Sequence, residues 1–376
     1  MFERVLILSV SAGAGHLRAA EAVEKAFLQT GAARQVLSVD TLRYTTKLFR
    51  NLYSKAYIEV VNKAPDLLGW LYDSLDKPWK NERRRLAFDR LNTLPFVQML
   101  KDFRPEVAVC THFLPAEIIS HLKEKGVLQT RQAVVITDLD VHAMWLYRQV
   151  EHYFVAMEET QAHLAELGIP GHTITVSGIP IDPVFAQPKD KTQMRAKYGL
   201  NPALPTILVS AGGFGVGPIE QLVQSLAKMS NPAQVIAICG RNESLKARME
   251  ELTQAMPETS RLRIHPVGYT TDMDEYMAAS DLVLGKPGGL TTSEALAKGL
   301  GLVIVNPIQG QEERNSDHLL EEGAAIRCNN LPVLGWKIDR LLDDPARLAA
   351  LQAHARRIGR PWAALDIVDK LQRLQA

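Results

Sequence analysis

Short apolar runs rich in branched residues recur along the chain, and each is followed by a turn and a segment with helical periodicity. The first run, 4–10, leads into a glycine turn and then a helix with alanine and leucine on one face, which Gly31 ends. A second run at 34–40 completes a strand–helix–strand unit with buried parallel strands. Further runs continue the alternation at 106–113, 132–138 and 152–157.

A proline-containing segment then interrupts the pattern before it restarts. Pro180, Pro183 and Pro188 precede a polar run, and a new strand, glycine loop and helix begin near residue 205. The chain therefore divides into two similar halves. We predict an α/β fold of two Rossmann-like domains facing across a cleft, with an N-terminal domain at 1–187, a second at 188–352, and a C-terminal helix at 353–376 that packs back towards the first.

Residues 44–104 depart from this alternation, because their period is helical and aromatic side chains are interleaved with cations. Residues 43–104 hold 13 Lys and Arg against 7 Asp and Glu, in a chain whose formal net charge is only +1. Such a segment suits a helix lying on an anionic membrane surface. It equally suits a helical insertion with a buried apolar face and a solvated basic face.

The overall composition excludes several classes of protein. With 376 residues, 46% hydrophobic and 23% charged, the chain is an ordinary globular one, and its +1 charge does not favour nucleic-acid binding. Cys110, Cys239 and Cys328 lack paired spacing, so we expect buried thiols and neither disulfides nor a zinc site. No apolar run approaches 18 residues, so we expect neither a signal peptide nor a transmembrane span. We therefore expect a cytoplasmic protein.

The richest candidate chemistry lies between residues 285 and 315. The pattern predicts a strand, a glycine turn, a helix, a second strand and then a polar loop. Gly288 and Gly289 let backbone N–H groups approach a ligand, and Leu290 and Thr291 lie where a helix N-terminus offers unpaired donors to a phosphate. A glycine pair alone indicates only a tight turn.

The residues after this turn strengthen the ligand interpretation. Glu294 lies one turn into the same helix, where its carboxylate can accept hydrogen bonds from a ribose diol. Gln311, Glu312 and Asn315 follow the next strand at its carboxyl end, where open α/β sheets hold ligands. The ordered combination predicts a sugar-nucleotide site.

The N-terminal glycine turn requires a separate interpretation. Gly13 and Gly15 could begin a dinucleotide fingerprint, and Asp40 lies at about the spacing of a ribose-binding acid. Arg18 occupies the position of the third glycine, so a nicotinamide cofactor is not favoured.

Ordered motifs over nearly the whole chain resemble those of GT-B glycosyltransferases. More narrowly, the chain resembles the monogalactosyldiacylglycerol synthase and diacylglycerol glucosyltransferase group, which is related to the transferase that adds N-acetylglucosamine to lipid I. Ala14 departs from the more usual G-G-G-H sequence, a change that a negative φ would absorb. The motifs, in order, are GAGHLRAAEAV, APDLLGWLY, THFLPAEI, ITDLDVHAMW, VSGIPIDPVF, SAGGFGVGPI, CGRNESL, VGYTTDM, KPGGLTTSEALAKGL and GQEERN.

The resemblance implies an enzyme that moves a hexose from a UDP-sugar to the hydroxyl of diacylglycerol at the inner membrane face, with inversion. It implies His16 as general base, with Gly13 and Gly15 allowing close approach of the acceptor. The implied donor contacts are Gly289, Leu290 and Thr291 for the diphosphate, Glu294 for the ribose, Gln311, Glu312 and Asn315 for the sugar, Gly268 and Met273 for the uracil, and Gly213, Arg241, Asn242, Pro287 and Gly288 as further contacts.

Two further motifs have competing interpretations. Asp138-Leu139-Asp140 has the D-x-D form of metal-dependent transferases, but GT-B enzymes generally neutralise phosphates with a helix N-terminus and cations, so we expect neither a metal nor another cofactor. His142 and Trp145 match a motif on the acceptor or membrane side, and are equally a buried core pair. The alternatives are a transferase with a UDP-N-acetylglucosamine donor or another lipid acceptor, a soluble UDP-sugar isomerase, and a catalytically silent sensor.

Overall fold

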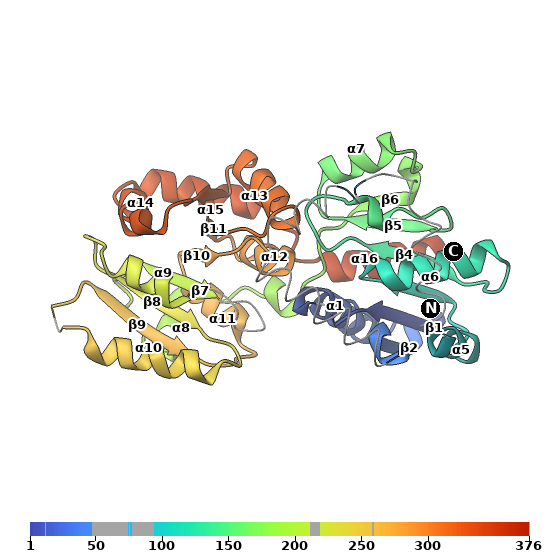
Figure 1. Ribbon diagram of the computed structural model, residues 1–376, viewed down its shortest axis with the longest axis horizontal. Coiled ribbons are helices and arrows are strands. Elements are labelled where there is room, and N and C mark those ends of the chain that lie inside the picture. The colour runs from blue at the N-terminus through green and yellow to red at the C-terminus, as the bar shows by residue number, and fades with distance from the viewer. Residues whose placement is uncertain are drawn as a thin grey trace.

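The computed structural model describes residues 1–11, 13–46, 74, 76, 94–210, 219–257 and 259–375. They form two lobes, each built on a parallel six-stranded sheet with helices packed on it (Figure 1). The predicted α/β architecture of two Rossmann-like domains is confirmed.

The N-terminal sheet has the strand order β2-β1-β3-β4-β5-β6, and all its neighbouring strands pair in parallel. The last of these strands lies at the sheet edge and was not expected from the sequence. The strands are β1 (Phe2–Ser9), β2 (Ala33–Asp40), β3 (Val107–Cys110), β4 (Arg131–Val135), β5 (His152–Val155) and β6 (Ile174–Val176).

The C-terminal sheet repeats this plan with the order β12-β11-β10-β7-β8-β9. Its edge strand β12 has three residues and was also not expected from the sequence. The strands are β7 (Thr206–Ser210), β8 (Ala233–Ile238), β9 (Leu262–Val267), β10 (Leu282–Gly285), β11 (Gly301–Ile304) and β12 (Ala325–Arg327).

Helices connect these strands and cover the sheets. The α-helices are α1 (Ala14–Thr30), α5 (Leu94–Phe103), α6 (Phe113–Glu124), α7 (Glu158–Glu166), α8 (Lys191–Lys197), α9 (Ile219–Leu226), α10 (Glu243–Ala255), α11 (Met273–Ala279), α12 (Gly289–Ala297), α13 (Gln311–Glu321), α14 (Leu334–Leu342), α15 (Pro345–Ile358) and α16 (Ala363–Gln375). Short 3-10 helices are η1 (Thr41–Tyr44), η2 (Ala143–Trp145), η3 (Gly171–Thr173), η4 (Pro183–Ala186) and η5 (Leu331–Val333).

The chain crosses between the lobes twice, after β6 and after α15. The last helix, α16, lies beside α1 in the N-terminal lobe (Figure 1). Its buried residues Ile367, Val368 and Leu371 share a core with Val23 and Phe27 of α1. Burying side chains of this size stabilises the fold by about 1.5–3 kcal/mol each, so the C-terminal segment holds the two lobes together.

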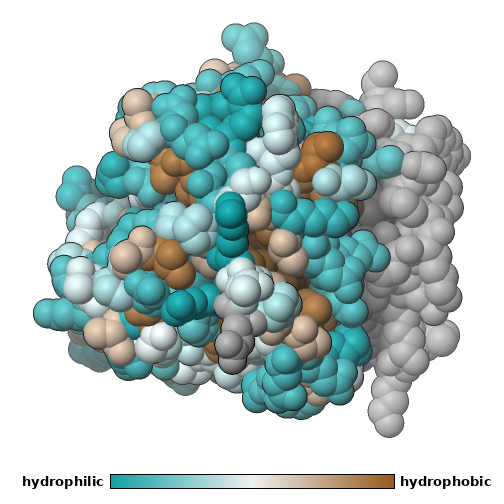
Figure 2. Space-filling model, turned by 90° about the vertical axis from the view of Figure 1, so that its left-hand side faces the viewer, coloured by the Kyte–Doolittle hydropathy of each residue, from teal (hydrophilic) through white to brown (hydrophobic). Residues whose placement is uncertain are grey.

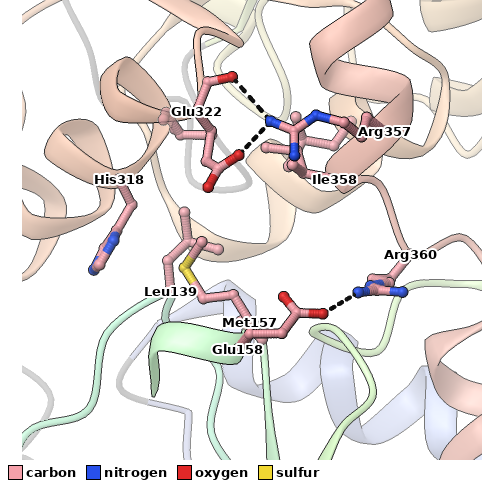
Figure 3. A pocket seen from close by; sticks show the side chains of 11 residues that line it. Leu139, Met157, Glu158, His318, Glu322, Arg357, Ile358 and Arg360 are labelled. Atoms are coloured by element: carbon pink, nitrogen blue, oxygen red, sulfur yellow. Dashed lines mark hydrogen bonds and ion pairs between the residues drawn. The ribbon is translucent and has the colours of Figure 1, made fainter. Parts of the chain in front are cut away.

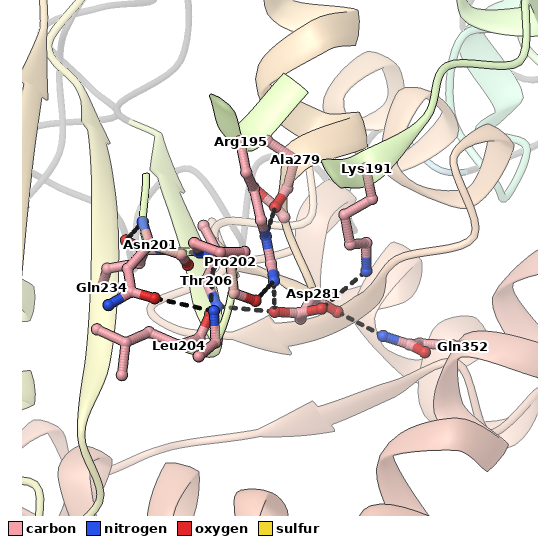
Figure 4. Close-up of polar contacts among 12 residues, drawn as sticks. Lys191, Arg195, Asn201, Pro202, Leu204, Thr206, Gln234, Ala279, Asp281 and Gln352 are labelled. Carbon is pink, nitrogen blue, oxygen red and sulfur yellow. Dashed lines mark hydrogen bonds and ion pairs between the residues drawn. The ribbon is translucent and has the colours of Figure 1, made fainter. Parts of the chain in front are cut away.

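The segment after the first crossing is anchored to the C-terminal sheet by Asp281, which follows α11 (Figure 4). Its carboxylate accepts hydrogen bonds from Lys191 Nζ at 2.8 Å, from Arg195 Nη2 at 2.6 Å and from the backbone N–H of Thr206 at 2.7 Å. Charge-assisted hydrogen bonds of this kind are strong. They fix α8 to the C-terminal lobe.

The prediction of a polar loop at 311–315 is wrong, because these residues form the first turn of α13. Gly310 has φ 83° and turns the chain, and the Glu312 carboxylate then accepts a hydrogen bond from the Ile308 N–H at 2.7 Å. This helix was not predicted because its first turn is polar and the buried apolar side chain Leu319 comes two turns later.

Three other expectations concern the cysteines, the basic segment and membrane-spanning helices. The three cysteines are free and buried, as expected. Most of the basic segment 44–104 lies outside the described residues, so its two interpretations stay open. None of the helices in the described part of the chain combines the length and hydropathy needed to cross a bilayer. The outer end of the C-terminal lobe is mainly hydrophilic, with apolar side chains of the described residues in separate small groups (Figure 2).

Candidate active site

The N-terminus of α12 lies directly against the N-terminal lobe, near α1 (Figure 1). A methyl group added to Gly289 would lie well under 3.0 Å from the carbonyl oxygen of Thr137, which follows β4. A methyl group added to Gly15 would lie 3.6 Å from Leu290. The two glycine motifs identified in the sequence therefore meet across the boundary between the lobes.

His16 lies in the first turn of α1, which begins at Ala14. Its Nδ1 is 3.0 Å from the carbonyl oxygen of Thr111 and 2.9 Å from the hydroxyl oxygen of Thr137. A carbonyl oxygen can only accept a hydrogen bond, so Nδ1 carries the proton and Nε2 keeps its lone pair. This tautomer is the one that a general base using Nε2 requires.

The protonation of His16 gives a direct test of this arrangement. Burial lowers the pKa of His16 to about 4, although the hydrogen bond to Thr111 raises it. We expect the imidazole to stay neutral from pH 8 down to about pH 5, with its NMR Cε1–H resonance titrating near pH 4. His16→Asn assigns the resonance by its loss. A midpoint near the ordinary value of 6.5 would show that His16 is solvated and that this environment is incorrect.

Aromatic side chains enclose His16 on the side of the N-terminal lobe. The ring centroid of His112 is 4.6 Å away and that of Trp145 is 6.4 Å away. Trp145 is 3% exposed, and His142 is equally buried and accepts a hydrogen bond from the Met144 N–H at 3.1 Å. Trp145 therefore belongs to the core beside His16, and His142 is buried three residues before it. Their acceptor or membrane role stays a prediction.

Glu294 in α12 is 1% exposed and forms an ion pair with Arg18 of α1 across the lobe boundary. Burial raises the pKa of Glu294 to about 7, and the charge of Arg18 acts against this rise. The side chain of Arg18 remains 38% exposed. The residue predicted to bind ribose is therefore in place, but the opposite lobe holds its carboxylate.

A cavity of about 250 Å³ opens beside this ion pair. Leu290, Thr291 and Glu294 of α12 and Met273 of α11 are among the residues that line it. The structure thus brings four of the predicted donor residues to one cavity. The remaining lining residues are Arg18, Glu21, Ala22, Lys25, Asp182, Val184, Phe185, Ser210, Ile238, Gly240, Tyr269, Thr270 and Thr271.

Of the three predicted sugar-binding residues, Gln311 and Asn315 contact the N-terminal lobe, whereas Glu312 lies beside Gly288 of its own lobe. The Gln311 amide donates to Asp138 Oδ1 at 2.6 Å. Asn315 is fully buried, accepts from the Leu139 N–H at 2.9 Å and donates to the Pro287 carbonyl at 3.1 Å. Glu312 Oε1 would be 3.6 Å from a methyl group on Gly288. Asn315 thus bridges the lobes, and its contact with a sugar stays a prediction.

The Asp138-Leu139-Asp140 segment is hydrogen-bonded to α13. Asp138 bonds to Gln311 and Leu139 bonds to Asn315, as described above. The Asp140 carboxylate accepts a hydrogen bond from Arg314 Nη1 at 3.2 Å. Burial raises the pKa of Asp138 to about 6, which the hydrogen bond from Gln311 opposes. Each of the three residues therefore has a protein partner on α13.

A different set of side chains has metal-ligand spacing. Among the residues that the structure describes, Glu159, His318 and Glu321 place ligand atoms within 4.8 Å of one another, with both glutamates exposed. This group is separate from the two aspartates of the D-x-D motif and does not line the cavity beside Glu294.

The other predicted donor contacts are distributed around β8 and β9. The Arg241 guanidinium lies 4.7 Å from the ring centroid of Tyr269, beside the cavity. Asn242 caps α10 by accepting from the Leu245 N–H at 3.0 Å. A methyl group on Gly268 would lie 3.5 Å from Lys246. Gly213 lies outside the described residues, and a methyl group on Gly13 would meet open space.

A second cavity, of about 200 Å³, lies where the chain crosses back after α15. Ion pairs flank it, with Arg357 bonded to Glu322 and Arg360 bonded to Glu158 at 2.6 Å (Figure 3). Both arginines are therefore paired within the protein. This cavity is lined by residues of both lobes and includes none of the predicted donor residues.

Sequence reasoning missed Thr137, Tyr269 and the role of Arg18. One signal could have found the last of these, because cavity-lining residues of α1 lie at positions 18, 21, 22 and 25. That spacing marks a single helix face. Asp40, by contrast, is structural, since it accepts from the N–H groups of Ser11 and Leu42 at 3.1 Å each.

The chain matches two family models, one per lobe. Residues 16–181 match the model of monogalactosyldiacylglycerol (MGDG) synthase, and residues 206–355 match that of the glycosyltransferase family 28 C-terminal domain. A processive diacylglycerol beta-glucosyltransferase of Staphylococcus saprophyticus is 30% identical over 351 residues, which cover 93% of this chain and 87% of that protein. The chain belongs to the monogalactosyldiacylglycerol synthase and diacylglycerol glucosyltransferase group.

Solved structures confirm the GT-B fold of this glycosyltransferase. MurG of Acinetobacter baumannii superposes with a TM-score of 0.64 at 16% identity, covering 99% of each chain. A UDP-N-acetylglucosamine 2-epimerase of Listeria monocytogenes superposes with a TM-score of 0.61 at 13% identity, covering 100% of this chain and 97% of that one. Likenesses at such low identity concern the fold alone, so membership of the glycosyltransferase group rests on the sequence.

Proposed function

We propose that this glycosyltransferase moves a hexose from a UDP-sugar to the hydroxyl of diacylglycerol at a membrane surface, with inversion at the anomeric carbon. The observation that carries the proposal is the approach of the glycine turn before His16 to the N-terminus of α12, beside a cavity lined by Glu294. In the proposal, a base from one lobe acts on a donor held by the other. The named activity of the Staphylococcus relative supplies the acceptor class.

In the proposed reaction, the sugar is transferred in one displacement. His16 Nε2 takes the proton of the acceptor hydroxyl as its oxygen bonds to the anomeric carbon. The bond from that carbon to the β-phosphate oxygen breaks at the same time, and the electron pair leaves with UDP. The N-terminus of α12 offsets the charge that develops on the leaving group. The negative diphosphate also raises the basicity of the nearby imidazole, which burial alone depresses.

Product analysis tests the proposal. We expect the protein, incubated with diacylglycerol liposomes and each of a panel of UDP-sugars, to release UDP and form a lipid whose mass rises by one hexose. The anomeric proton of the new lipid should show the configuration opposite to that of the donor. A new lipid from UDP-N-acetylglucosamine alone would support the alternative donor, and a converted sugar nucleotide without any new lipid would identify an isomerase.

Membrane attachment is expected to depend on anionic lipid. The excess of cations in 43–104 predicts binding to liposomes that contain phosphatidylglycerol and weaker binding to purely zwitterionic ones. Added salt should release the protein, because screening shortens the range of attraction between the surface and the cations. Sedimentation with liposomes at several salt concentrations measures this. Binding that ignores both lipid charge and salt would favour the alternative of a helical insertion with a solvated basic face.

Sugar transfer is expected to continue after treatment with EDTA. Helix dipole and side-chain cations can neutralise a diphosphate, and the D-x-D carboxylates bond to Gln311 and Arg314. Initial rates with and without chelator, at equal ionic strength, measure the effect. A marked loss that Mg²⁺ or Mn²⁺ restores would show that a metal takes part.

A further inference from the structure

The ion pair between Arg18 and Glu294 lies inside the site that the proposed function assigns to the donor. It joins residues 276 positions apart in the sequence and from opposite lobes. The hydroxyls of a bound ribose would compete with the guanidinium for this buried carboxylate. We therefore expect donor binding to displace Arg18.

We propose that Arg18 is a donor-binding residue that exchanges partners, leaving Glu294 for the β-phosphate of the bound UDP-sugar. The inference rests on the proposed function and adds a role for a residue of the N-terminal lobe in the donor site. In the exchange, the ribose hydroxyls replace Arg18 at Glu294, and the phosphate oxygens replace Glu294 at Arg18. Neither charge is left buried without a partner, which would be costly.

Distances along α12 make the exchange feasible. Thr291 precedes Glu294 by three residues, so it lies about 4.5 Å nearer the helix N-terminus at 1.5 Å per residue. A change of rotamer in a long arginine side chain covers that distance. The same cavity is lined by Arg18, Leu290, Thr291 and Glu294, and Arg18 is already partly exposed to it.

The chemistry of the guanidinium suits both partners. Its planar fork of N–H donors fits a carboxylate and a phosphate in the same bidentate manner. Lys25, the other cation of α1 that lines the cavity, is already paired with Asp182. Arg18 is also two residues from His16 on the same helix. The group that binds the leaving diphosphate and the proposed base would therefore be held by one helix of the acceptor lobe.

Calorimetric titration with UDP, UMP and uridine tests the exchange. For the wild-type protein we expect UDP to bind more tightly than UMP because of Arg18. In Arg18→Ala the affinity for UDP should fall roughly ten- to hundredfold, as charged hydrogen bonds are lost, while UMP and uridine binding stay near wild type. Arg18→Lys should keep part of the difference, since it retains the charge without the fork.

Two further variants distinguish a failure of the proposed exchange from a failure of the donor site. Glu294→Gln should weaken all three ligands, because each contains the ribose. Arg360→Ala removes an exposed ion pair between the crossing segment after α15 and Glu158, away from the donor cavity, and should leave UDP affinity within about twofold of wild type. Circular dichroism melting curves check that each variant folds.

Each remaining outcome decides against the exchange in a recognisable way. Equal losses for all three ligands in Arg18→Ala would make Arg18 only a partner of Glu294. Unchanged UDP affinity in that variant, with losses in Glu294→Gln, would overturn the exchange but keep the proposed donor site. A wild-type protein that does not bind UDP would overturn the proposed function itself.

Discussion

Replacing His16 by alanine is expected to lower the rate of sugar transfer roughly 10²–10⁴-fold, the usual contribution of a positioned general base. An uncharged diacylglycerol hydroxyl holds its proton tightly at pH 7, so attack on the anomeric carbon depends on a group that removes it. Affinity for UDP should stay within about threefold of wild type, because the loss concerns the transition state. Initial rates with diacylglycerol liposomes and calorimetric titration with UDP measure the two quantities.

Two variants distinguish a lost base from a disturbed fold. His16→Asn places an amide N–H near the position of Nδ1, so it can still donate to the Thr111 carbonyl, but it offers no basic nitrogen. It should be as inactive as His16→Ala. His172 is exposed in η3, away from the site, and His172→Ala should transfer sugar at the wild-type rate. If His16→Asn retained substantial activity, the proton would have to leave by another route, with Asp138 the next candidate.

The order of the elements could be predicted from the sequence because parallel strands leave a local signature. Each long strand is an apolar run of branched residues, such as 4–10 or 206–210, and each is followed by a turn. The edge strands β6 and β12 span three residues each, which is too few to show a pattern of apolar residues. Helix α13 was missed because its first turn faces the other lobe with polar side chains.

The candidate donor residues of α12 could be located in the sequence for a similar reason, because Gly288, Thr291 and Glu294 lie within two helical turns and carry a local motif. Their contacts across the lobe boundary were not. The pairing of Arg18 with Glu294 and the approach of Gly289 to Thr137 depend on how two folded lobes meet. No periodicity in either segment encodes that geometry, so it required the three-dimensional structure.

Replacing Gly289 by alanine is expected to reduce sugar transfer on the order of 10²-fold by holding the lobes apart, since a misplacement of about 1 Å is enough for such a loss. The added methyl group would lie well under 3.0 Å from the Thr137 carbonyl oxygen and 3.2 Å from Ile179. The backbone oxygen cannot rotate away as a side chain can. Relief therefore requires α12 to withdraw from the segment after β4 that contains Thr137, whose hydroxyl also contacts His16.

The same substitution should not harm the C-terminal lobe, which makes the result decisive. Gly289 is the first residue of α12, and alanine is more favourable than glycine within a helix by about 0.5–1 kcal/mol. UMP binding should persist, while small-angle scattering should show a more extended particle. Gly171→Ala, where an added methyl group meets nothing within 4 Å, controls for glycine replacement as such. Full activity in Gly289→Ala would mean that transfer does not require the lobe contact seen here, and that the base acts from a more open arrangement.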